Sequence, residues 1–274
     1  MPSIAEKRAA FRELHRSGCF VIPNPWDIGS ARYLQHAGFK ALASTSSGFA
    51  WTQGRPDHGI TREMVLDHLR VLSEATGLPV NADFENGFAD DPDGVAESVR
   101  LAIDTGIAGL SIEDSTGPTA HELFPLDVAL DRLRAARKAI DASGEDVMLV
   151  GRAECFIAGM PDIGETVRRI KAYRDAGADI LYAPGLRSKE QIEQVVAAAD
   201  PKPVNVLVGG ALPFSVADLA ALGVRRISVG GGLAMVGWAA IMKAATTLAQ
   251  GSFDGMLHEL PPESPNQVMA SLGS

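Results

Sequence analysis

Eight short apolar runs recur along the chain, and polar residues follow most of them. They occupy residues 19–23, 40–45, 78–83, 108–113, 147–152, 178–183, 203–208 and 225–230. Short runs that are rich in β-branched and small apolar residues are typical of strands buried on both faces. Amphipathic stretches with helical spacing lie between most of these runs. The pattern therefore predicts strands that alternate with helices.

Glycine marks the junctions between a helical stretch and the strand that follows it. Four such junctions are Ala37-Gly38-Phe39, Thr105-Gly106-Ile107, Ala176-Gly177-Ala178 and Leu222-Gly223-Val224. Glycine adopts the left-handed conformation that ends a helix, so each tripeptide predicts a helix end directly before a buried strand.

Strands that alternate with helices form parallel sheets, and eight such units are the composition of a (β/α)8 TIM barrel. A doubly wound open sheet is the alternative. The barrel is favoured because polar residues follow most strands, whereas an open sheet would concentrate them at one switch point. No linker divides the 274 residues, so we expect a single domain over residues 1–274.

Composition narrows the classes of partner. The net charge of −9 is spread along the chain, and no Lys/Arg cluster is interleaved with aromatic residues, so no nucleic-acid partner is expected. The charged N-terminal stretch does not resemble a signal peptide, and no apolar run of membrane-spanning length stands out, so we expect a cytoplasmic protein without a membrane partner. Cys19 and Cys155 lack CxxC spacing, which predicts free thiols.

Acidic residues end two neighbouring predicted strands. Asp83 and Glu85 follow one strand, and Glu113 and Asp114 follow the next. Carboxylates that converge at one end of a barrel repel one another unless a cation joins them, and oxygen ligands favour Mg²⁺ or Mn²⁺. The alternative is that these acids only cap helices or pair with arginine.

Two further segments end at the same face. Arg152 follows the apolar stretch VMLVG, and its guanidinium suits either a substrate carboxylate or the acids themselves. Ser44, Thr45 and Ser46 lie in a small-residue loop through Gly48 that either binds an anionic oxygen or only connects two elements.

The segment 115–125, STGPTAHELFP, directly follows Glu113 and Asp114. A loop in this position can close over a substrate and supply His121 or Glu122 as an acid or base, although a surface histidine is more often inert. Near the C-terminus, apolar side chains recur at helical spacing and predict a packing face, which would suit a contact between subunits. They are Met235, Trp238, Ile241 and Met242.

Several motifs in order along the chain resemble the isocitrate lyase and phosphoenolpyruvate mutase superfamily. They are GFKALASTSSGFAWTQGRPD, NADFENGF, GLSIEDSTGP, GRAECFIAG with AYRDAGADIL, and PVNVL. The resemblance implies an α/β barrel whose eighth helix is exchanged with a neighbouring subunit, with residues from about 233 to 274 packed on that neighbour. It also implies a homodimer or homotetramer, an essential Mg²⁺ (or Mn²⁺), and cleavage or formation of C–C or P–C bonds beside a 2-oxo acid.

The resemblance assigns roles to residues at matching positions. Asp83 falls on the direct metal ligand, and the acids that hold the metal through water are Asp57, Glu85 and Glu113. The loop of Ser44, Thr45 and Ser46 falls on the residues that grip the substrate carboxylate. Arg152 falls on the arginine that binds the oxo acid, and Asn205 on a polar position directed toward a second carboxylate.

The chain departs from this family where the proton donor lies. The lyases carry a cysteine in a Lys-Lys/Arg-Cys-Gly-His loop after the Glu-Asp pair, and a glutamate after the sixth strand, where this chain has Pro184. The gating-loop lysine of the mutases is also absent from STGPTAHELF. The proton donor therefore stays unassigned.

The leading hypothesis is a Mg²⁺-dependent carbon–carbon lyase that acts on a small 2-hydroxy- or 2-oxo-di- or tricarboxylate, similar to isocitrate or methylisocitrate, through a pyruvate-type enolate. An oxaloacetate-type decarboxylase or a phosphonopyruvate-class enzyme is the enzymatic alternative. A non-catalytic protein that binds a 2-oxo acid is the alternative outside enzymes.

Overall fold

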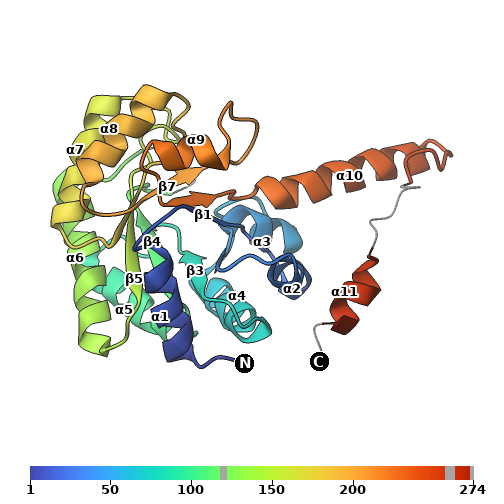
Figure 1. Cartoon of the computed structure of the whole chain (residues 1–274), viewed down its shortest axis with the longest axis horizontal. Helices are drawn as coiled ribbons and strands as arrows, with labels where there is room; N and C mark the ends of the chain where they lie inside the picture. The colour runs from blue at the N-terminus through green and yellow to red at the C-terminus, as the bar shows by residue number, and fades with distance from the viewer. Residues whose placement is uncertain (118–121, 257–262, 272–274) are drawn as a thin grey trace.

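Eight parallel strands form a barrel in the computed structural model, which describes residues 1–117, 122–256 and 263–271 (Figure 1). The strands are β1 (Phe20–Ile22), β2 (Leu42–Ala43), β3 (Val80–Asp83), β4 (Gly109–Glu113), β5 (Met148–Arg152), β6 (Ile180–Tyr182), β7 (Val204–Leu207) and β8 (Arg226–Ser228). Each lies inside one of the eight runs predicted from the sequence.

Pairing between the first and last strands closes the sheet on one side. The hydrogen-bonded order is β1-β8-β7-β6-β5-β4-β3-β2, and every pair is parallel. At the remaining seam, the Ala43 N–H donates to the carbonyl oxygen of Pro23 over 3.0 Å. The TIM barrel is therefore confirmed, and the open-sheet alternative is wrong.

Helices connect the strands and cover the outside of the barrel (Figure 1). They are α1 (Ile4–Leu14), α2 (Ile28–His36), α3 (Ser46–Thr52), α4 (Arg62–Ala75), α5 (Pro92–Ile103), α6 (Leu126–Ser143), α7 (Ile163–Asp175), α8 (Lys189–Ala199), α9 (Val216–Ala221), α10 (Gly232–Ala249) and α11 (Pro265–Ser271). The junction glycines Gly38, Gly106, Gly177 and Gly223 have φ values of 90°, 85°, 101° and 88°. This is the left-handed conformation that the sequence predicts at helix ends.

Helix α1 closes the barrel at the N-terminal ends of its strands. Phe11 is fully buried there and packs with Ile22, Met148 and Val150 in the interior cluster. Gly109 leaves room for it, because a Cβ at this position would lie 2.8 Å from Cε1 of the Phe11 ring. Apolar packing fills this end, which leaves the C-terminal ends of the strands for chemistry.

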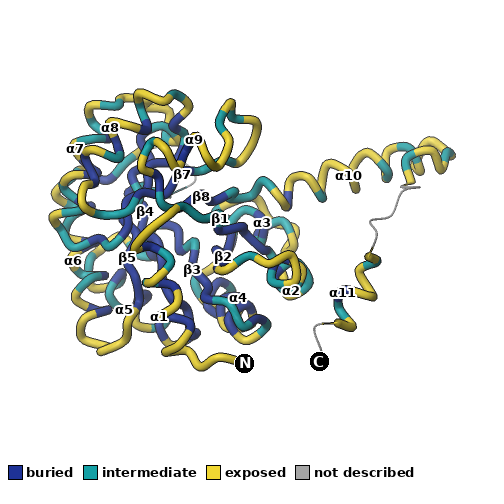
Figure 2. The backbone as a smooth tube through the Cα atoms, viewed as in Figure 1, coloured by how far each residue is buried: buried dark blue, intermediate teal, exposed yellow. Residues whose placement is uncertain are grey.

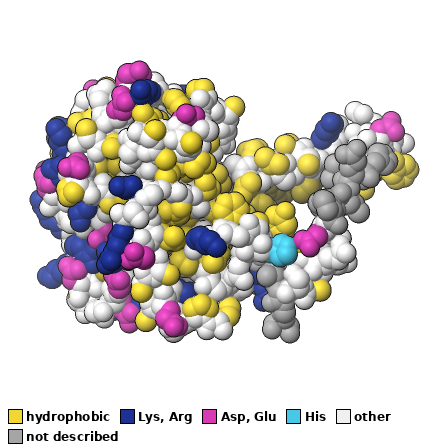
Figure 3. Space-filling model, in the orientation of Figure 1, with side chains coloured by type: hydrophobic (Ala, Val, Ile, Leu, Met, Phe, Trp, Pro, Cys, Tyr) yellow, Lys and Arg dark blue, Asp and Glu magenta, His cyan; other side chains and the backbone are white. Residues whose placement is uncertain are grey.

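Helix α10 extends away from the barrel (Figure 1), and most of its length is exposed in this single chain (Figure 2). Ile241 and Met242 are 59% and 63% exposed. By length and composition α10 is apolar enough to cross a membrane, which the sequence reasoning did not expect, although one such helix is weak support for a membrane span. The surface view shows hydrophobic side chains along it (Figure 3), as the predicted packing face requires.

Helix α11 lies against α2 of the same chain. Val268 in α11 is buried, and Glu263 lies 2.8 Å from Nε2 of His36 at the end of α2. Exchange of the eighth helix, and packing of residues 233–274 on a neighbouring subunit, stay predictions because one chain is present.

Candidate active site

A cavity of about 190 Å³ opens at the C-terminal ends of the strands. Its lining includes the sequence-predicted residues Ser44, Thr45, Ser46, Asp57, Asp83, Arg152 and Asn205. The strand register explains part of this convergence, because Glu113, Arg152, Tyr182 and Asn205 are successive partners across β4 to β7. Side chains that are distant in sequence thus share one face of the barrel.

Asp83 and the segment after β2 are joined by hydrogen bonds. The Ser46 N–H and hydroxyl both donate to Oδ2 of Asp83 over 2.9 Å, and the Asp83 N–H donates to Oγ of Ser44 over 2.8 Å. The sequence predicted only a loop here, but Ser46 begins helix α3 and Thr45 caps it by accepting from the Gly48 N–H. The carboxylate therefore sits at a helix N-terminus, where N–H groups favour negative charge.

The guanidinium of Arg152 is paired with three acidic side chains. Its Nη1 is 2.9 Å from Asp83 and 3.1 Å from Glu113, and its Nε pairs with Glu154. Burial alone would lower the pKa of Arg152. The negative charges of Glu154 and Glu113 outweigh this effect and hold the pKa well above its ordinary value. Of the two roles left open by the sequence, pairing with the acids is the one shown here.

Glu85 lies on a strained loop beside His58. Both residues adopt left-handed backbone conformations, with φ values of 46° and 59°, which non-glycine residues rarely adopt. His58 Nδ1 is 3.3 Å from Oε2 of Glu85, and this hydrogen bond raises the pKa of His58 to about 9. Burial raises the pKa of Glu85. Its Oε1 is buried and has no hydrogen-bond partner among the described residues.

These acids fit a divalent cation held mainly through water. Asp57 and Asp83 line the cavity, Glu113 pairs with Arg152 beside it, and Asp83 and Asp57 lie close enough to Glu85 to raise its pKa. Burial also raises the pKa of Glu113. Within the described ranges, no three Asp, Glu, His or Cys side chains form a ready-made metal-binding group. The unpartnered Glu85 oxygen and the acid excess are consistent with a cation that has one direct protein ligand and otherwise binds water.

Asp114 points away from the cavity and anchors the structure behind it. Its carboxylate accepts hydrogen bonds from the Glu154 N–H (2.8 Å), from Arg169 (3.0 Å) and from the Tyr173 hydroxyl (2.5 Å). The Phe124 N–H also donates to the Asp114 carbonyl oxygen over 2.8 Å. The adjacent acids Glu113 and Asp114 therefore have different roles, one toward the site and one in the fold.

The cavity floor contains residues that the sequence reasoning missed. Arg226 donates from Nε to Oδ1 of Asn205 (2.9 Å) and from Nη1 to Oδ1 of Asn81 (3.3 Å). Asn205 in turn donates from Nδ2 to Oγ of Ser228 over 3.0 Å. The alternation Arg226-Ile227-Ser228 was the available signal, because a charged residue two positions before a polar strand end points into the barrel.

Of the predicted acid/base pair in the loop after β4, only Glu122 is described, and it does not reach the cavity. His121 lies outside the described residues. Glu122 is exposed and is absent from the cavity lining, while its backbone carbonyl oxygen accepts from the Thr116 N–H over 3.0 Å. The structure thus gives Glu122 no position beside the cavity, and the role of His121 stays a prediction.

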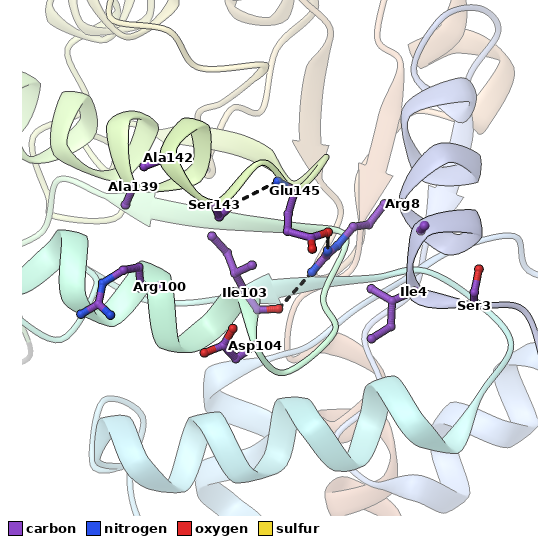
Figure 4. A pocket seen from close by; sticks show the side chains of 11 residues that line it. Ser3, Ile4, Arg8, Arg100, Ile103, Asp104, Ala139, Ala142, Ser143 and Glu145 are labelled. Atoms are coloured by element: carbon purple, nitrogen blue, oxygen red, sulfur yellow. Dashed lines mark hydrogen bonds and ion pairs between the residues drawn. The ribbon is translucent and has the colours of Figure 1, made fainter.

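A larger groove of about 790 Å³ lies at the opposite end of the barrel, between α1, α5 and α6 (Figure 4). There Arg8 pairs with Glu145 and donates to the carbonyl oxygens of Ile107 (2.9 Å) and Ile103 (3.0 Å). These contacts satisfy the buried guanidinium within the fold. The groove therefore has a structural explanation, in keeping with the N-terminal face of barrel strands.

The chain matches a protein family and a solved structure over most of its length. The family model described as phosphoenolpyruvate phosphomutase matches residues 11–249. A solved structure described as a putative lyase/mutase from Burkholderia cenocepacia is 45% identical, covers 97% of both chains and superposes with a TM-score of 0.92.

Two relatives carry specific enzyme names. Oxaloacetate decarboxylase from Chromohalobacter salexigens is 30% identical over 82% of this chain and 79% of its own length. The 2-methylisocitrate lyase of Escherichia coli is 29% identical over 69% of this chain and 65% of its own length.

Proposed function

Because the chain belongs to the phosphoenolpyruvate phosphomutase family, we propose that it is a Mg²⁺-dependent enzyme that cleaves a small 2-oxo- or 2-hydroxy-di- or tricarboxylate through a pyruvate-type enolate. The chain is an enzyme of the carbon–carbon lyase type, and its metal and substrate are the proposed parts. The observation that carries the proposal is one cavity with acids at its rim and hydrogen-bond donors on its floor. We further expect it to act in solution in the cytoplasm.

The donors at the rim suit the carboxylate and adjoining oxygen of a 2-oxo acid. Ser44 contributes a hydroxyl that accepts from the Asp83 N–H and keeps its own hydrogen to donate, while the Ser46 N–H and hydroxyl donate to Asp83. Such groups are fixed before the reaction, so they stabilise developing negative charge without reorganising. Arg152 would place positive charge beside the enolate oxygen.

The acids would hold the metal. Asp83 would be its direct ligand, and Asp57, Glu85 and Glu113 would bind its water molecules. A bound Mg²⁺ would act as a Lewis acid that polarises the substrate oxygen. In that state Ser46 would keep Asp83 oriented through its two hydrogen bonds.

Decarboxylation of oxaloacetate is a second candidate, and the size of the cavity favours it. A volume of about 190 Å³ lies below the roughly 300 Å³ at which pockets for drug-sized ligands begin. A four-carbon dicarboxylate suits this space better than a tricarboxylate. Loss of CO₂ also needs no general acid at a leaving alkoxide, which agrees with the absence of the lyase cysteine loop.

A substrate panel tests the proposal. Oxaloacetate, 2-methylisocitrate, isocitrate and 2,3-dimethylmalate are incubated with the enzyme and Mg²⁺, and pyruvate, glyoxylate and succinate are followed by proton NMR. We expect turnover of at least one substrate, its loss in EDTA and its return with added Mg²⁺. The matched variants are Asp83→Asn, expected to be inactive, and Asp67→Asn on the exposed face of α4, expected to be active. Metal-independent turnover, or none on any substrate, contradicts the proposal.

A further inference from the structure

Arg226 is a buried cation at the cavity floor without an acidic partner. It is 3% exposed at the start of β8 and belongs to the cavity lining. Among the described residues, no carboxylate lies within 4.0 Å of its guanidinium, whereas Arg152 at the rim contacts Asp83, Glu113 and Glu154. Burial lowers the pKa of Arg226 to about 10, which leaves it charged at neutral pH. The floor is therefore positive and the rim is rich in acids.

The contacts of Arg226 fix how two amides face the cavity. A guanidinium has only donors, so the groups that it meets on Asn205 and Asn81 must be their oxygens. This settles the orientation of Asn205, which could otherwise be rotated by 180°. Its nitrogen then has two donor hydrogens, and Ser228 accepts one of them. The other hydrogen has no protein acceptor in the described part of the chain.

We propose that Arg226 is a positioning residue that turns the Asn205 nitrogen toward the ligand and so selects substrates with a distal carboxylate. This inference rests on the proposed function and names its substrate class. A carboxylate accepts a hydrogen bond from the free N–H of Asn205 and is attracted by the unpaired positive charge of Arg226 below it. A carboxamide at the same place gains neither the charge attraction nor a second acceptor oxygen.

The test compares two probes that differ only at the distal group. Racemic malate and its 4-carboxamide are titrated into the enzyme with Mg²⁺ in a calorimeter, and the readout is the ratio of their dissociation constants. We expect the wild type to favour malate by about tenfold to a hundredfold. Arg226→Met releases the amide and removes the charge, so the ratio should fall at least tenfold, and Arg226→Lys should restore part of it.

A matched control separates selection from stability. Arg8→Met removes another buried arginine, which donates to carbonyl oxygens at the opposite end of the barrel. It should lower the melting temperature and leave the ratio unchanged. A second variant, Asn205→Asp, keeps the oxygen that faces Arg226 and replaces the nitrogen with oxygen. It should fold, because Arg226 supplies the counter-charge, and it should lose the preference for malate.

The outcomes are distinguishable. A reduced ratio in Arg226→Met and in Asn205→Asp, with Arg8→Met unchanged, supports the inference. An unchanged ratio in a folded Arg226 variant overturns it and leaves the proposed function standing. If Arg226→Met does not fold, the ratio of dissociation constants in Arg226→Lys and Asn205→Asp decides. A ratio below that of the wild type in both supports the inference, and wild-type ratios in both overturn it. If the wild type binds neither probe and the substrate panel also fails, the proposed function falls first and the inference falls with it.

Discussion

Replacement of Asp114 by asparagine should lower the free energy of unfolding without removing the metal site. The substitution keeps the volume and removes the charge that accepts from Arg169 and Tyr173. Loss of one partner of a buried ion pair costs about 3–5 kcal/mol. Arg169 keeps a second acid, Glu165, at 2.7 Å, so we expect a smaller loss of about 2–4 kcal/mol. At about 2–4 °C per kcal/mol, the melting temperature should fall by about 4–16 °C.

Urea denaturation and calorimetry measure this loss of stability. Tyr173→Phe serves as a second variant that removes only part of the same contacts. Tyr173→Phe removes one hydrogen bond to the carboxylate and should cost about 1–3 kcal/mol, which is no more than Asp114→Asn. Both variants should still bind Mn²⁺ at 20 °C, since Asp114 points away from the cavity. An Asp114→Asn protein within about 0.5 kcal/mol of the wild type would refute the anchoring role.

Further predictions concern the pH dependence of stability, the first turn of α3 and the oligomeric state. Burial lowers the pKa of His15 to about 3, so between that value and its ordinary 6.5 the unfolded state binds more protons and stability is lost as the pH falls. His15→Leu should reduce this loss by up to about 1.4 kcal/mol per pH unit in urea denaturation between pH 7 and 5, and an unchanged slope would contradict it. A Cβ on Gly48 would lie 2.6 Å from Cγ2 of Thr45, so Gly48→Ala should shift the first turn of α3 and lower kcat about tenfold or more on the substrate found by the panel. Full activity would contradict this prediction. Ile241→Glu puts a charge on the exposed face of α10 and should convert an expected dimer or tetramer into monomers in sedimentation velocity, whereas a monomeric wild type would exclude this interface.

Periodicity was enough to predict the barrel. The junction glycines and the eight buried runs report local backbone conformation and two-sided burial, which depend on nearby residues. The strand ends followed from the same pattern, so Asp83, Arg152 and Asn205 were placed at the cavity before the structure was known. Asp57 came from family resemblance alone, because no strand directly precedes it.

The sequence could not give the pairings across the barrel. Arg226 was overlooked because its partners Asn205 and Asn81 are on other strands, and register decides which side chains meet. The strained backbone of Glu85 and His58 is likewise a consequence of tertiary packing.

The central claim is that Asp83 and its neighbours bind one divalent cation. Electron paramagnetic resonance of free Mn²⁺, with pyruvate present, measures this binding directly in the wild type, Asp83→Asn and the exposed control Asp67→Asn. The account predicts one Mn²⁺ per chain in the wild type and in Asp67→Asn, and none in a folded Asp83→Asn protein. A wild type that binds no Mn²⁺, or an Asp83→Asn protein that binds it equally well, would contradict the account.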